Sequence, residues 1–220
     1  MRGGESRAGR RHPARRPPSR PSRQELEAAR DRTVDDVIAH NLRVLFCGIN
    51  PGLMSAATGH HFARPGNRFW PVLHASGFTP RLLRPDEEHE LPAYGLGITN
   101  VAARASARAD ELSDEEMREG GRLLAEKVLR YQPRRLAVLG ITAYRVAFRD
   151  KAAVIGPQAR VIGRTQIWAL PNPSGLNAHW TTATMAEEFA RLREAAERDE
   201  QNEQGDRDEQ DEWPGPPPGR

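Results

Sequence analysis

Short apolar runs alternate with amphipathic stretches through the middle of the chain. Four runs bounded by turn signals predict buried strands at residues 43–49, 96–101, 136–139 and 166–170. Helical periodicity predicts helices at residues 33–40, 67–76, 113–130 and 181–198, and one that follows the third strand and ends at Phe148. Ser113 and Glu116 form a capping-box signature, and Thr33 is the expected cap of the first helix. A further short strand is expected at residues 160–162.

This alternation predicts an α/β fold of three layers, with a central, mainly parallel sheet flanked by helices. Short apolar strands separated by helices are typical of parallel sheets that are covered on both faces. Functional sites in such folds lie beyond the carboxyl ends of the strands. Two unusual loops fall there: residues 50–52 (NPG) after the first strand and residues 171–176 (PNPSGL) after the last.

Composition changes at both ends of the chain. Residues 1–23 carry eight Arg against one Glu, whereas residues 197–212 carry nine acidic residues against two Arg. Such segments cannot bury enough apolar surface to fold. We therefore expect a disordered Arg/Pro-rich tail at 1–30, a single domain at 31–196, and a disordered acidic, then Pro/Gly-rich tail at 197–220.

The composition also excludes several classes of site. Cys47 is the only cysteine, which excludes a disulfide within the chain and a four-cysteine metal site. Its apolar strand predicts a buried core residue. No apolar run is long enough for a transmembrane helix, and the Arg10-Arg11 pair is not followed by the apolar stretch of a secretory signal. We therefore expect a cytoplasmic protein with no membrane partner.

Asn50 lies in a tight turn directly after the first strand. In such a turn the side chain of Asn can bond its own backbone. Alternatively, the strand end holds the amide rigidly at the bottom of a pocket, where it accepts a hydrogen bond from water and orients it. That role suits a reaction in which the leaving group departs early and positioning matters more than base strength.

Three linked motifs carry a resemblance to a known family. Residues 48–53 (GINPGL), 65–70 (PGNRFW) and 172–176 (NPSGL) resemble, in order and spacing, the mismatch-specific uracil/thymine-DNA glycosylase family. The similarity covers about residues 41–195. It implies a uracil-DNA glycosylase-like fold and a monofunctional enzyme, in which water attacks the sugar without a lysine Schiff base, a metal or a cofactor.

The resemblance assigns Asn50 to the nucleophilic water, and it assigns the backbone near Ile49 and Phe62 to the polar edge of an extruded base. The ring of Phe62 would stack on that base. Ser55 matches a small residue that sets the room for a 5-methyl group, and Asn100 either bonds the far edge of a pyrimidine or closes a turn. The expected base-binding residues are Ile49, Ser55, His61, Phe62, Asn100 and Ser106.

The second loop has a different expected role. Extrusion of a base leaves a gap in the duplex, and an apolar wedge can fill it. Leu176 at the loop tip is the candidate. Family members commonly carry a basic residue after this leucine, whereas this chain departs from the pattern with Asn177. The expected wedge and mismatch-loop residues are Asn172, Ser174, Gly175, Leu176 and Asn177.

Together these features predict a repair enzyme that starts base-excision repair. Its partner would be double-stranded DNA with a G·U or G·T mismatch, and an abasic-site endonuclease would act downstream. We expect a monomer associated with the nucleoid of a bacterium. Two alternatives remain: a non-catalytic mismatch-binding protein, against which Asn50 argues, and a nucleotide-binding domain, for which the Gly-rich phosphate fingerprint is missing.

The basic N-terminal segment generates a first prediction. Removal of residues 1–23 should weaken DNA binding and flatten its dependence on salt, because fewer phosphate contacts release fewer counterions. Base specificity should not change, since phosphate contacts carry no sequence information. Affinity measured over a series of salt concentrations tests this, and an unchanged salt slope would show that the arm does not contact DNA.

Overall fold

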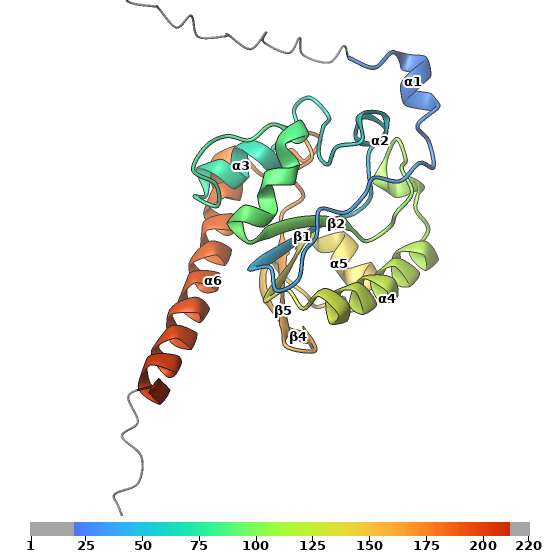
Figure 1. Ribbon diagram of the computed structural model, residues 1–220. Helices are drawn as coiled ribbons and strands as arrows, with labels where there is room; N and C mark the ends of the chain where they lie inside the picture. Colours follow the sequence, from blue (N-terminus) through green and yellow to red (C-terminus); the bar gives the residue numbers. More distant parts are fainter. Residues whose placement is uncertain (1–19, 212–220) are drawn as a thin grey trace, which may run out of the picture.

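A five-stranded sheet in the order β2-β1-β3-β5-β4 forms the centre of the molecule (Figure 1). The computed structural model describes residues 20–211, with side chains to Gln201. The first four strands in this order are parallel, and β4 pairs antiparallel with β5 at one edge. The strands are β1 (Val44–Gly48), β2 (Leu96–Asn100), β3 (Arg135–Leu139), β4 (Gly156–Ile162) and β5 (Thr165–Leu170). This topology confirms the predicted α/β class.

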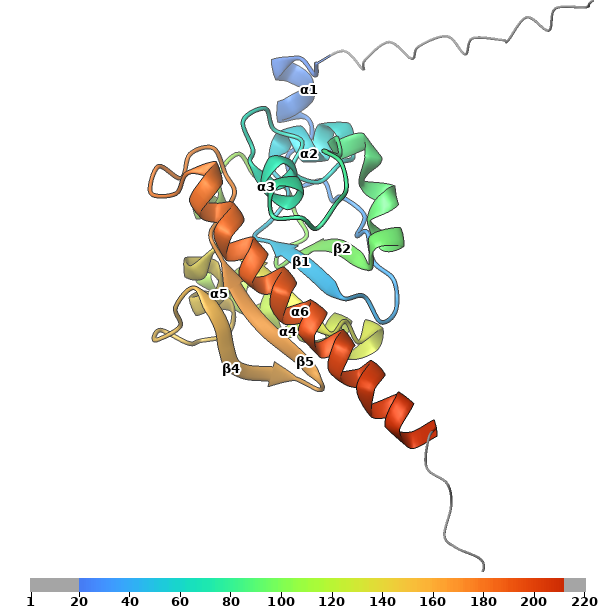
Figure 2. The ribbon, with the colours of Figure 1, turned by 90° about the vertical axis from the view of Figure 1, so that its left-hand side faces the viewer.

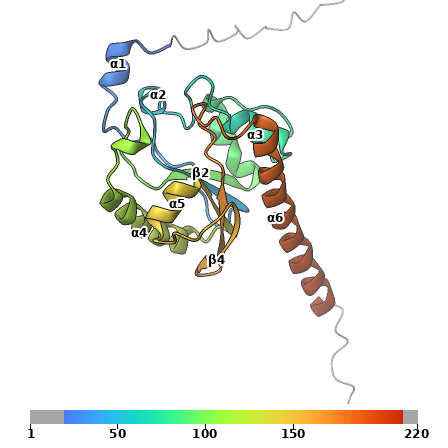
Figure 3. The same ribbon diagram turned by 180° about the vertical axis from the view of Figure 1, so that it is seen from behind.

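Helices cover both faces of the sheet. α6 runs along one face beside α3 (Figure 2), and α4 and α5 cover the other (Figure 3). The short helices α1 and α2 lie at the upper end of the molecule in Figure 1. The helices are α1 (Arg23–Glu27), α2 (Leu53–Thr58), α3 (Phe69–Ala75), η1 (Pro85–Tyr94), η2 (Ala109–Glu111), α4 (Asp114–Tyr131), α5 (Ile141–Ala147) and α6 (Thr182–Asp211).

The central strand β1 is buried along its whole length. Successive side chains of a strand point to opposite faces, so Phe46 packs in the core under α3 and α6, whereas Leu45 and Cys47 pack in the core under α4 and α5. Phe46 contacts the rings of Phe69 and Phe189 at centroid distances of 5.5 and 5.7 Å. Burial on both faces explains the continuous apolar run in the sequence.

The helix expected at 33–40 is wrong. The structure has no helix there, and Val37 exchanges two backbone hydrogen bonds with Ile98 of β2, at 2.9 and 2.8 Å. The two residues form an antiparallel bridge, so the segment covers the free edge of the sheet. An unpaired edge offers backbone groups to any extended segment nearby, and here that pairing overrides the local helical pattern.

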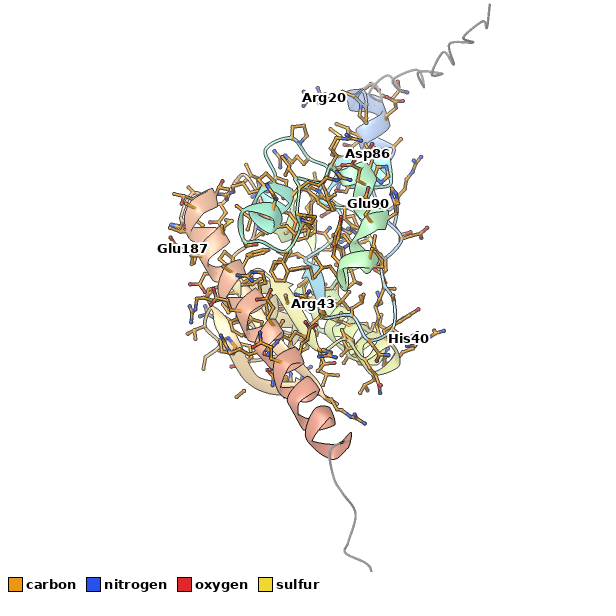
Figure 4. All side chains as sticks on the ribbon, turned by 60° about the vertical axis from the view of Figure 1, so that its left-hand side comes forward. Arg20, His40, Arg43, Asp86, Glu90 and Glu187 are labelled. Atoms are coloured by element: carbon orange, nitrogen blue, oxygen red, sulfur yellow. The ribbon has the colours of Figure 1, made fainter. Side chains whose placement is uncertain are left out.

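Parts of both segments expected as tails are helical. Residues 23–27 of the expected N-terminal tail form α1, and α6 continues to Asp211, so that residues 197–211 are helical. Arg43 lies beside α6 (Figure 4) and its Nε is 3.1 Å from the Glu200 carboxylate, while Arg135 bonds Asp199. The two arginines thus hold against the domain acidic residues that composition alone assigned to a tail. The remaining tail residues, 1–19 and 212–220, lie outside the described residues.

Parallel strands bring their carboxyl ends to one edge of the sheet. The loops that follow β1, β2 and β5 therefore meet there, although they come from widely separated parts of the sequence. The residues expected to carry the chemistry therefore lie at this one edge of the sheet.

In the described part of the chain, no helix is long and apolar enough to cross a membrane.

Close packing of α4 beneath the β2 loop generates a second prediction. A Cβ atom on Gly120 would overlap the Val101 carbonyl group, at 2.9 Å from its carbon. We expect Gly120→Ala to destabilise the protein by about 1–3 kcal/mol, because backbone atoms must move to relieve the overlap. Chemical denaturation measures this. Leu123→Ala, at a half-exposed position of the same helix, is the control and should change stability by less than about 1 kcal/mol. A more stable Gly120→Ala variant would contradict the packing argument.

Candidate active site

A cavity of about 610 Å³ lies at the carboxyl ends of the strands. The structure brings all the expected catalytic and pocket residues to its wall: Ile49, Asn50, Ser55, His61, Phe62, Asn100 and Ser106. The loop after β5 closes one side of it, with Asn172, Ser174, Leu176 and Asn177 among the lining residues. A larger hollow of about 1340 Å³ lies over α4 and contains none of the expected site residues except Asn100; charged side chains pair across it, as Arg104 does with Glu116. The smaller cavity is therefore the candidate site.

The side-chain amide of Asn50 has a defined orientation. Its Nδ2 donates to the carbonyl oxygen of Arg104 at 3.0 Å and to Oγ of Ser106 at 2.8 Å. A carbonyl oxygen can only accept, so the nitrogen must face this segment. Both amide hydrogens are then used, and Oδ1 remains as the acceptor atom of the side chain. Asn50 does not use its amide in its own turn, which was the alternative reading of the sequence.

Ser106 holds the amide of Asn50 from behind. Its Oγ donates to the carbonyl oxygen of Arg108 at 2.7 Å, so the same oxygen accepts from Asn50. Ser106 is only 2 % exposed, and its backbone N–H bonds the carbonyl oxygen of Pro51 at 3.2 Å. The sequence predicts Ser106 in the base-binding pocket, and the structure places it at the cavity wall in contact with Asn50.

The imidazole of His61 is buried, and burial favours its neutral form. Its Nε2 lies 3.0 Å from the carbonyl oxygen of Asp35, and because this oxygen only accepts, Nε2 carries the proton. The unprotonated Nδ1 then accepts from Nδ2 of Asn100 at 3.4 Å. Burial lowers the pKa of His61, and the nearby Glu88 carboxylate opposes that shift.

Glu88 also fixes the segment that carries His61. Its carboxylate accepts from the His61 backbone N–H at 2.8 Å and lies 3.0 Å from Nδ1 of His60. The carboxylate is mostly buried, and it comes from η1, far along the chain from these histidines. Neither Glu88 nor Asp35 was expected at the site, because nothing in their local sequence links them to it.

Phe62 forms an aromatic wall of the cavity. One face of its ring stacks on Phe69 at a centroid distance of 4.2 Å, and the half-buried ring lines the cavity. Gly48 at the end of β1 lies directly against it. A Cβ atom there would stand 2.5 Å from Oδ1 of Asn100 and 3.3 Å from the ring of Phe62. Only glycine allows these side chains to approach the strand end so closely.

The loop after β5 uses its polar side chains internally. Oδ1 of Asn172 accepts from the Ser174 N–H at 3.0 Å, and Nδ2 of Asn177 donates to the Asn172 carbonyl at 3.0 Å. Oγ of Ser174 accepts from the N–H of Leu176 at 3.3 Å. Leu176 is 70 % exposed. The polar residues thus shape a turn that presents one large apolar side chain to solvent.

The arrangement is suited to neutral, positional chemistry. Asn50 supplies an oriented acceptor, Phe62 a surface for stacking, and Asn100 an amide at the end of β2. The described residues hold no cluster of three or more His, Cys, Asp or Glu placed to bind a metal ion. Such a cavity can hold a planar polar ring and direct a water molecule toward it.

Comparison with known proteins matches most of this chain to one family. The Uracil DNA glycosylase superfamily matches residues 36–197, more than half of the chain. A solution NMR structure of a proposed uracil DNA glycosylase from Methanosarcina acetivorans is 20 % identical, covering 74 % of this chain and 98 % of that chain with a TM-score of 0.49. A structural likeness at this level carries no information on activity.

The buried His61 generates a third prediction. Its pKa is lowered on folding, so the unfolded chain binds more protons as the pH falls through the ordinary value of about 6.5. We expect the free energy of unfolding to fall below that pH, by up to about 1.4 kcal/mol per pH unit, and His61→Asn to lose this component. Denaturation of both proteins over a pH series measures the difference, because all other titrating groups are shared. Parallel pH profiles would mean that His61 titrates normally.

Proposed function

The chain belongs to the uracil DNA glycosylase superfamily, and we propose that it is a monofunctional glycosylase that removes uracil mispaired with guanine from double-stranded DNA. The orientation of the Asn50 amide is the observation that carries this proposal. Its Nδ2 is tied to Arg104 and Ser106, so that Oδ1 is the atom left to hold a water molecule. The product would be free uracil and an abasic site for a strand-cleaving endonuclease.

The proposed reaction needs positioning more than a strong base. The bond between C1′ of the sugar and N1 of uracil breaks with its electron pair moving to the base, which leaves the sugar cation-like. Water held by Asn50 then forms the new bond to C1′ and releases its proton to solvent or to the departing base. A neutral amide can orient this water in a reaction where the leaving group departs early.

Recognition of the base would combine stacking with one oriented amide. Phe62 offers a ring face to the cavity, and stacking on a side chain is a common way to hold an extruded base. Asn100 turns its Nδ2 toward His61, so its Oδ1 is the acceptor on the other side. An acceptor suits the N3–H of uracil or thymine, which cytosine lacks.

The small, buried Ser55 favours an extension of the substrate range to thymine and damaged pyrimidines. Its Oγ is held by the Ala63 N–H at 3.2 Å, so the side chain has a fixed place in the cavity wall. One methyl group changes discrimination by only about 1–3 kcal/mol, so the mispair itself contributes much of the selectivity. Extrusion is easiest at a mismatch, and Leu176 would fill the gap it leaves.

The oriented amide generates the fourth prediction. Asn50→Ala should lower the single-turnover rate of uracil release from a G·U duplex by at least about 100-fold, because no side-chain amide then orients the attacking water. Ser106→Ala should cost roughly 3- to 10-fold, since the amide remains but loses one of its partners. Quantification of free uracil and of alkali-sensitive strands measures both.

The control is Asn41→Gly, which deletes an exposed amide outside the cavity at a left-handed position that glycine tolerates. It should leave the rate within about twofold. Release from Asn50→Ala as fast as from the parent would refute the mechanism. Tight binding of the parent to G·U duplexes without any base release would instead indicate the non-catalytic mismatch-binding protein.

A further inference from the structure

The hydrogen bonds that the loop after β5 makes within itself are all short in sequence range. The hydrogen bonds made by Asn172, Ser174 and Asn177 within it join residues at most five positions apart. Such bonds define the turn around Leu176, but they do not fix the turn relative to the cavity. A wedge that is pushed against a base pair needs support from another part of the molecule.

That support comes from the side chain of Arg68. Its Nη2 donates to the carbonyl oxygens of Ser174 and Asn177 at 2.7 and 2.8 Å, and its Nη1 donates to the carbonyl oxygen of Trp180. The backbone N–H of Arg68 donates to the carbonyl oxygen of Pro173 at 2.9 Å. One residue therefore binds four carbonyl groups of the loop, on both sides of Leu176.

Arg68 itself stands on a rigid base. It is the residue that precedes α3, whose first residues, Phe69 and Trp70, are buried in the core. The Phe69 N–H is capped by Oδ1 of Asn67 at 2.9 Å, and Nε1 of Trp70 donates to the His61 carbonyl at 3.2 Å. The position of the guanidinium is thus set by the core and by the cavity wall.

A second contact presses the loop against the same segment. A Cβ atom on Gly175 would stand 2.6 Å from the carbonyl oxygen of Gly66. The loop backbone therefore lies closer to this segment than any residue with a side chain would allow. Gly66 and Arg68 together form one seat for the residues on either side of Leu176.

The chemistry of the seat is specific to arginine. A guanidinium holds its donors in a fixed planar fork, whereas a lysine ammonium is a compact point charge. Among the described residues, the hydrogen-bond partners of the Arg68 side chain are all neutral carbonyl groups, and no carboxylate forms an ion pair with it. Its charge is therefore not neutralised by a carboxylate in that part of the chain.

We propose that Arg68 is a positioning residue that orders the Leu176 loop before DNA binds, an inference that rests on the proposed glycosylase function. A loop already held in place loses little conformational entropy when it enters the duplex. Arg68 acts through Leu176 and does not touch the reacting atoms. Its loss should therefore impair extrusion of the base and leave the chemistry at Asn50 intact.

The first test measures loop order without DNA. Arg68→Lys keeps the charge but removes the fork, and hydrogen exchange of residues 172–180 should become at least about tenfold faster. Arg145→Lys is the matched control, since Arg145 binds the carbonyl oxygen of Ala153 at 2.7 Å in a different loop. It should not change exchange at 172–180. Unchanged exchange in Arg68→Lys would overturn the proposal.

The second test separates extrusion from chemistry. Arg68→Lys should release uracil from a G·U duplex about 10- to 100-fold more slowly, but from single-stranded DNA within about threefold of the parent rate. Gly175→Ala, which disturbs the seat independently, should give the same split. In a Leu176→Ala background, Arg68→Lys should add little. Equal losses on both substrates, or fully additive losses with Leu176→Ala, would overturn the proposal.

The two tests distinguish this inference from the function on which it rests. If the parent protein releases uracil from neither substrate, the glycosylase function fails, while the exchange measurement still decides whether Arg68 orders the loop. If the parent releases uracil and Arg68→Lys retains the full duplex rate, only the role of Arg68 fails.

Discussion

Two hydrogen bonds from one nitrogen atom define the chemistry of the cavity. Nδ2 of Asn50 binds the Arg104 carbonyl and Ser106 Oγ, which tie the loop after β1 to the segment after β2. The segment makes further contacts, because the Arg104 side chain binds Glu116 at 2.6 Å and the Glu111 carbonyl at 3.1 Å. The two bonds from Nδ2 fix the direction in which the side-chain oxygen of Asn50 points, and they do so before any substrate arrives.

The same principle, polar groups fixed in advance by other polar groups, recurs around the cavity. The Asp35 carbonyl sets the tautomer of His61, and His61 in turn sets which end of the Asn100 amide faces it. Carbonyl groups of the loop after β5 converge on Arg68. Groups that are ordered beforehand lose little entropy when they bind, which matters most where the proposed chemistry depends on positioning and not on a strong base.

The sequence predicted the strands well because their signal is local. Each of β1, β2, β3 and β5 is a short apolar run, and the Ser113 capping box places the start of α4 correctly. It failed where tertiary contacts override local preference. The segment at 33–40 pairs with β2 instead of forming a helix, and acidic residues beyond 196 remain helical where arginines of the domain bind them. Composition cannot report a partner that lies elsewhere in the chain.

By itself the sequence determined the α/β class and the edge of the sheet where the chemistry gathers, because these follow from short apolar runs and from the loops at strand ends. Its resemblance to a known family then named residues that the structure places at the cavity wall. Only the tertiary structure decided how those residues are oriented. Asp35 lies 26 positions from His61, and Asn177 lies 109 positions from Arg68. Hydrogen bonds across such separations depend on how strands and loops pack in space, and no local pattern of side chains encodes them.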